Sequence, residues 1–163
     1  METLRIIKAI LVATVGGWAL FIAYDNVVDY ASNWAFVQHV LAMDTVFPDN
    51  ALKSRAITDP TIQKLAYWSI IVTEALIAVV CLWGAWRLSA ARHDRRAFIA
   101  AKRPAAVGLL LVWLLYYVGF VIVGGEWFSM WQSKIWNGQA TAVDFLTCAM
   151  FVTIVLLLPE EDA

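Results

Sequence analysis

The sequence predicts an all-α, polytopic membrane protein: a four-helix transmembrane bundle with a short extra helix in the first outer loop. Hydrophobic residues make up 62% of the 163 residues, charged residues make up 15%, and the mean hydropathy is +0.70. Soluble domains average about 45–50% apolar and about 25% charged residues. Four apolar runs of spanning length are separated by polar segments. We therefore expect residues 1–163 to form a single membrane domain.

The first span is predicted over residues 4–24. A cleaved signal peptide is the alternative, because basic residues precede the apolar run. The run from Ala9 to Ala23 is at or beyond the upper end of the roughly 7–15 apolar residues of a signal peptide. In addition, no small-x-small pair immediately precedes Tyr24. We therefore interpret the run as a membrane span.

The first outer loop is predicted over residues 25–66. Asp25, Asp29 and Asn33 are spaced four apart, so they share one face if the helix continues. We expect an interfacial helix from about Tyr30 to Ala42, because apolar residues give these turns one hydrophobic side. The segment that follows has prolines and mixed charges, which predicts an extramembrane loop with short helical turns at most.

The second span is predicted over residues 67–88, with aromatic residues toward both ends. Glu74 lies about two turns inside this span. A charged group in hydrocarbon costs roughly 2.5–3.5 kcal/mol on insertion scales, so Glu74 needs a partner or a proton. Glu74 is therefore the most informative single residue of the sequence.

The third span is predicted over residues 105–124, with Pro104 at its first turn. A second outer loop, rich in tryptophan, covers residues 125–139. The fourth span is predicted over residues 140–158 and is ended by Pro159 and an acidic tail.

Basic residues predict the orientation of these spans. Eight of the twelve Lys and Arg residues fall in the N-terminal segment or in and just before the loop over residues 89–104. The positive-inside rule then places both termini and this loop in the cytoplasm. The arginines also suit an anionic-lipid or phosphate site, but topology alone explains them.

Polar groups of all four spans are expected at one depth, in the outer leaflet. They include the following candidate ligands of a divalent cation: Asp25, Asp29, His39, Glu74, Glu126 and Asp144. Calcium would take oxygen ligands only, whereas zinc would use His39 as well. Two alternatives stay open: the groups hydrogen-bond loop backbone and helix ends, or they receive a residue of a partner protein.

Several functional classes are disfavoured by the residues. His39 and His93 are predicted on opposite sides of the membrane, which argues against a bis-histidine haem. The two cysteines lie in apolar runs without metal or redox spacing, and the net charge of −1 gives no nucleic-acid surface. Trp113, Tyr116 and Tyr117 form an aromatic stripe that suits helix packing better than a quinone site. No common hydrolase or phosphate-binding motif is present.

Three segments carry a family resemblance: DNVVDYASNWAFVQHVLAMDTVFPDN, RAITDP and GGEWFSMWQSKIWNGQ. Together they resemble a bacterial family of predicted small integral membrane proteins that is catalogued as a domain of unknown function. The resemblance covers nearly the whole chain. It implies four spans and a location in the bacterial inner membrane, and it supplies no activity, substrate or catalytic residue.

Three functions follow as hypotheses. The first is a non-catalytic accessory or scaffold protein in the lipid bilayer, whose outer surface docks a partner or further copies of itself. The residues expected on that surface are Trp127, Trp131, Gln132 and Trp136. The second is a component of an oligomeric channel or transporter for an ion or small solute. The third is a membrane enzyme or a cofactor-binding subunit.

Overall fold

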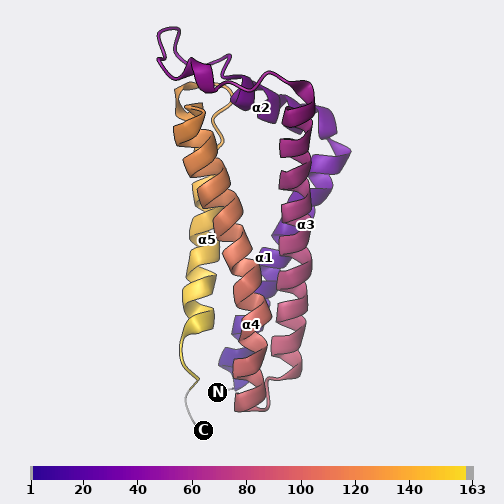
Figure 1. The fold of residues 1–163 in the computed structure, drawn as a ribbon. Helices are drawn as coiled ribbons and strands as arrows, with labels where there is room; N and C mark the ends of the chain where they lie inside the picture. Colours follow the sequence, from indigo (N-terminus) through magenta and orange to yellow (C-terminus); the bar gives the residue numbers. More distant parts are fainter. Residues whose placement is uncertain (1, 161–163) are drawn as a thin grey trace.

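The computed structural model describes residues 2–160, and these form an all-helical bundle without strands. Its long helices are α1 (Glu2–Val28), α3 (Pro60–Ala90), α4 (Arg95–Val112), which continues as η2 (Trp113–Trp127), and α5 (Gln139–Leu157) (Figure 1). By length and composition, α1, α3, the combined α4–η2 helix and α5 are each suited to cross a membrane. The predicted all-α fold is confirmed, and its four helices of spanning length are consistent with a polytopic membrane protein.

Helix α2 (Tyr30–Ala42) is the extra helix of the first outer loop, and its bounds match the expected ones. Figure 1 shows that α2 lies across one end of the bundle, whereas α1 begins and α5 ends at the other. We call these the loop end and the terminal end. Met43, with φ of 50°, ends α2 in the left-handed conformation. Two short 3₁₀ turns, η1 (Lys53–Arg55) and η3 (Met130–Gln132), complete the loop end.

Two helices begin earlier in the chain than the spans predicted for them. Helix α3 begins at Pro60 because the Asp59 carboxylate accepts hydrogen bonds from the backbone N–H groups of Thr61 and Ile62, at 2.7 and 3.1 Å. Pro60 therefore starts a helix, although we had taken it as a loop residue.

Helix α4 begins at Arg95, inside the segment predicted as a cytoplasmic loop. The Asp94 side chain accepts a hydrogen bond from the Ala97 N–H at 2.9 Å and caps the helix. Pro104 consequently lies in the helix interior, and its predicted place in a first turn is wrong. Its ring nitrogen cannot donate to the carbonyl of Ala100, a defect that membrane helices tolerate.

Small residues let α3 pack closely against α4. A side chain at Gly84 would meet the backbone of Ala105 at 2.7 Å, and one at Gly108 would meet the Cys81 sulfur at 2.5 Å. The helices meet without space for a methyl group at these two positions. The core around this contact includes fully buried Ile77, Cys81, Leu88, Ala105, Leu109 and Val112.

Helix η2 continues α4 with π-helical geometry. The Phe128 N–H donates to the Val123 carbonyl at 3.0 Å, a bond between residues five apart, as in a π-helix. π-Helical turns are rare and occur often beside functional sites. Tyr116 and Phe120 of η2 both border the cavity described next.

Candidate functional site

Glu74 is buried in the loop-end half of the bundle, with 2% of its surface exposed. The side-chain amide of Asn26, from α1, donates to Glu74 Oε2 at 2.6 Å. The Tyr116 hydroxyl, from η2, donates to Glu74 Oε1 at 3.4 Å. The Tyr67 hydroxyl donates in turn to the Asn26 backbone carbonyl at 2.7 Å. Three long helices thus contribute to one buried polar network.

This network borders a cavity of about 360 Å³ between helices α1, α2, α3, η2 and α5. Its lining residues are Trp18, Ile22, Asn26, Asn33, Phe36, Val37, Tyr67, Ile70, Glu74, Tyr116, Phe120, Gly138, Thr141, Ala142 and Phe145. Cavities of roughly 300–1,000 Å³ with few polar groups are typical of small-molecule sites. Exposed Thr141 and Trp18 lie at its rim, whereas Glu74 is deeply buried.

The Glu74 carboxylate has no cationic partner within the described chain. Among residues 2–160, none of the ion pairs includes Glu74. Its partners are an amide and a phenol, both neutral. A buried carboxylate is costly unless it is paired or protonated, so Glu74 requires either a proton or a countercharge from outside the described residues.

The predicted cation ligands do not come together in the structure. Asp25, Asp29, Glu126 and Asp144 are exposed, and only Glu74 is buried. Within residues 2–160, no group of three or more His, Cys, Asp or Glu residues is placed to hold a metal ion. The sequence placed these groups at one depth, but it did not give the direction in which each helix turns them.

His39 and Asp29 have local partners instead. His39 Nδ1 lies 2.7 Å from Asp44 Oδ2, and its ring stacks on Trp136 at 4.6 Å between centroids. The Ser32 hydroxyl donates to Asp29 Oδ1 at 3.0 Å. Both polar contacts join side chains within the first outer loop, and the alternative in which the polar groups hydrogen-bond loop backbone and helix ends stays a prediction.

The residues predicted for interaction join the two outer loops to each other. Gln132 Oε1 accepts hydrogen bonds from the Phe47 N–H and the Asn50 side chain, at 3.0 and 2.8 Å. The Arg55 guanidinium lies 4.3 Å from the ring centroid of Trp127 and donates to its carbonyl. Their predicted role in docking a partner stays a prediction, although Trp127 and Trp131 remain exposed.

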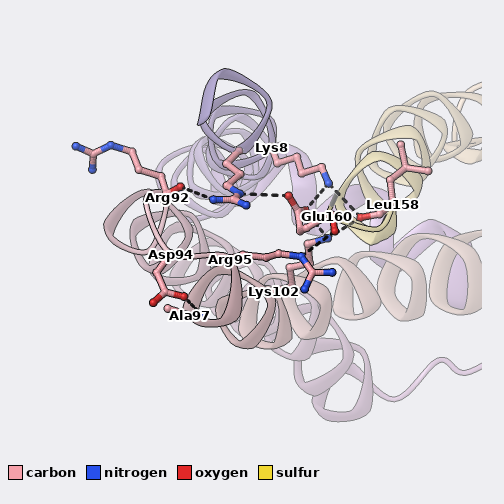
Figure 2. A network of polar contacts seen from close by, with 9 residues as sticks. Lys8, Arg92, Asp94, Arg95, Ala97, Lys102, Leu158 and Glu160 are labelled. Atoms are coloured by element: carbon pink, nitrogen blue, oxygen red, sulfur yellow. Dashed lines mark hydrogen bonds and ion pairs between the residues drawn. The ribbon is translucent and has the colours of Figure 1, made fainter. Parts of the chain in front are cut away.

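A second buried acid, Glu160, lies at the terminal end and is surrounded by cations (Figure 2). Lys8 and Lys102 place their Nζ atoms 2.6 and 2.7 Å from Glu160 Oε1. Arg5 Nε lies 3.5 Å from Oε2, and Arg95 Nε donates to the Glu160 backbone carbonyl at 3.0 Å. Burial opposes ionisation of Glu160, but the hydrogen bonds from Lys102 and Lys8 outweigh it and lower its pKa.

The sequence does not predict this cluster, because its pattern indicates Glu160 only as part of an acidic tail. The rest of that tail, residues 161–163, lies outside the described residues. A signal was present: Arg5 and Lys8 are three residues apart, so they share a face of the first helix. Two cations buried on one helix face require an acid from elsewhere in the chain.

Asn26, Tyr67 and Tyr116 are the partners of Glu74 that sequence reasoning missed. Tyr67 and Glu74 are seven residues apart, which places them on one face of α3, and this spacing was the available signal. Tyr116 was assigned to helix packing, and it does pack, edge-to-face on Phe145 at 4.5 Å. It also lines the cavity.

Comparison with known proteins bears on the chain as a whole. A family described as predicted small integral membrane protein (DUF2165) matches residues 4–159. The chain belongs to this family. No curated protein and no solved structure matches it. The family membership and the four long apolar helices agree that this family member is embedded in a lipid bilayer.

Proposed function

We propose that the protein is a non-catalytic accessory membrane protein that holds a small guest molecule in the cavity beside Glu74. The observation that carries this proposal is a buried acid that borders a cavity and has no cation of its own. A molecule bound in this cavity would supply the polar or charged partner that the described residues do not give Glu74.

The lining of the cavity supports binding rather than catalysis. It includes no histidine, cysteine, lysine or arginine, and Glu74 is its single carboxylate. Covalent catalysis requires a nucleophile and a base within hydrogen-bond reach of each other. The lining set has no imidazole or amine to act as that base, and its one hydroxyl–carboxylate contact is that of Tyr116 with Glu74, at 3.4 Å.

A channel or transporter component is the second candidate function. It is favoured by the position of the cavity between long apolar helices. On the terminal-end side of Glu74, however, Ile77, Ala78 and Cys81 of α3 are at most 1% exposed. A solute would meet close packing there, so transport through this chain requires an oligomer or a second conformation. A liposome flux assay without conductance would count against this candidate.

Native mass spectrometry of the protein released from its own membrane tests the binding proposal. Thr141 is exposed at the rim of the cavity, so Thr141→Trp is expected to block it without disturbing the core. Its neighbour Ala140 is also exposed but does not line the cavity, which makes Ala140→Trp the matched control. We expect wild type and the control to retain a small non-protein mass and Thr141→Trp to lose it. Equal retention by both variants would contradict the proposal.

We also propose a bacterial inner-membrane location with the terminal end in the cytoplasm. The support is the positive-inside rule, because eight of the twelve basic residues lie in the N-terminal segment or in and just before residues 89–104. We further propose that the second outer loop, where Trp127 and Trp131 are exposed, binds further copies of this chain or another membrane protein. Alkaline phosphatase is active only in the periplasm, so a fusion of this enzyme to the carboxy terminus is expected to be inactive. An active fusion would show that the carboxy terminus lies in the periplasm and would contradict the proposed orientation.

A further inference from the structure

The chemistry of the cavity lining indicates which class of molecule it accepts. We propose that the guest carries an organic ammonium group, held by the Glu74 carboxylate and surrounded by aromatic rings. This inference rests on the proposed function, because it names the ligand class of the same cavity. The aromatic lining residues are Trp18, Phe36, Tyr67, Tyr116, Phe120 and Phe145.

Charge is the first argument. Glu74 is 2% exposed and, within residues 2–160, pairs with no lysine, arginine or histidine. The hydrogen bonds from Asn26 and Tyr116 solvate the carboxylate in part but bring no positive charge. A cationic guest supplies a countercharge to the ionised acid, whereas beside a neutral guest Glu74 is compensated only by taking a proton.

The aromatic side chains are the second argument. Phe145 contacts two other lining rings edge-on: Trp18 at 4.0 Å and Tyr116 at 4.5 Å between centroids. Phe36 and Phe120 stack at 6.2 Å. Aromatic faces attract cations most strongly where water is excluded, and rings grouped around a site are the usual way that proteins bind alkylammonium groups.

An inorganic cation fits the same lining poorly. Calcium takes six to eight oxygen ligands, and other hard cations also require several oxygens. Glu74 is the single carboxylate of the lining, and within residues 2–160 no group of three or more His, Cys, Asp or Glu residues is placed to hold an ion. The volume of about 360 Å³ also suits a small organic molecule better than a bare ion.

Calorimetric titration of the detergent-purified protein tests the charge requirement. The probes are choline and 3,3-dimethylbutan-1-ol, in which carbon replaces the charged nitrogen while shape is kept, and ethanolamine as a primary ammonium. The detergent is dodecyl maltoside, which has no ammonium group. We expect choline or ethanolamine to bind at least about tenfold more tightly than the neutral alcohol, a difference typical of a buried charge contact.

Variants locate the effect at Glu74. Glu74→Gln is expected to remove the tenfold preference, whereas Asp144→Asn, a change at an exposed acid of α5, is expected to keep it. The wild-type comparison of choline with its carbon isostere stands even if Glu74→Gln fails to fold. Equal affinity for the charged and neutral probes overturns the ammonium inference but leaves the binding cavity in place. Binding of no probe, together with no retained mass in the native spectrum, overturns both.

The ammonium group could come from a soluble amine or from a phospholipid headgroup, and a bilayer titration separates these sources. Choline is titrated into nanodiscs of phosphatidylglycerol alone and into nanodiscs that also contain phosphatidylethanolamine. Apparent affinity that falls in the second set identifies the headgroup as a competitor, and unchanged affinity identifies a soluble amine. Both results support an ammonium site, whereas equal affinity for choline and its carbon isostere overturns it.

Discussion

Glu74 and Glu160 are buried to a similar degree, 2% and 6% exposed, but in opposite electrostatic surroundings. Glu160, at the terminal end, has the lysine ammonium groups of two helices within 2.7 Å of one carboxylate oxygen. Glu74, in the loop-end half, has an amide and a phenol and borders a cavity. The chain provides countercharges for one acid, and we propose that a bound molecule provides one for the other. Buried acids of one type can therefore serve stability or binding, depending on where their countercharge originates.

The largest expected effect is on stability, from Glu160→Gln. This change leaves Arg5, Lys8 and Lys102 near each other without their carboxylate. Removing one partner of a buried ion pair costs about 3–5 kcal/mol, and we expect the lower end here because the cluster lies near the end of the bundle. For a chain of this size, that lowers the melting temperature by about 6–12 °C. Thermal unfolding in detergent measures the shift.

Glu74→Gln is the matched control for that experiment, since it is the same substitution at the other buried acid. The amide keeps a hydrogen-bond acceptor for Asn26 and removes a charge without a cationic partner. We expect the guest-free protein to change by less than about 1 kcal/mol, in either direction. A melting temperature lowered as strongly as in Glu160→Gln would break the comparison, because Glu74 would then also have a countercharge within the protein.

A smaller and graded effect is expected from pH. The pKa of Glu160 is lowered from the usual value of 4.5, so folding favours its ionised form. The stability it contributes is therefore fully present above about pH 4.5 and is lost as pH falls through the lower folded-state pKa. Melting temperatures of wild type and Glu160→Gln, measured from pH 7 to pH 3, isolate this contribution from other acids. The difference between them should shrink below about pH 4.5, and a constant difference would show that Glu160 does not act through its charge.

The helices could be predicted better than the site. The short helix over Tyr30–Ala42 was predicted with its observed bounds, because apolar residues give these turns one hydrophobic side. Helix α4 was predicted too short because Pro104 and the surrounding charges resemble a loop, whereas the Asp94 cap begins a helix there. At the start of α4, the proline and the charges indicate a loop, whereas the Asp94 cap indicates a helix. Packing against the neighbouring helix decides between these two signals.

The cation cluster shows the limit for the site. Asp25, Asp29 and Asp144 were expected beside Glu74 because their depths in the spans agree, yet all three are exposed. Depth follows from position along a helix, but proximity also requires the rotation of each helix about its axis. Apolar residues surround these helices on most faces, since lipid and protein neighbours both accept them, so the pattern does not indicate the inward face.

The sequence by itself determined that this chain is a bundle of four long apolar helices with a short helix in the first loop, and that Glu74 is an acid in an apolar surrounding. These properties follow from the hydropathy of successive residues, which sets how each segment partitions between water and lipid. Only the tertiary structure decided that Glu74 meets Asn26 and Tyr116 at a cavity, while Glu160 meets Lys8 and Lys102. Those meetings depend on which faces of helices far apart in the chain pack together, and close contact between small residues such as Gly84 and Ala105 fixes that choice.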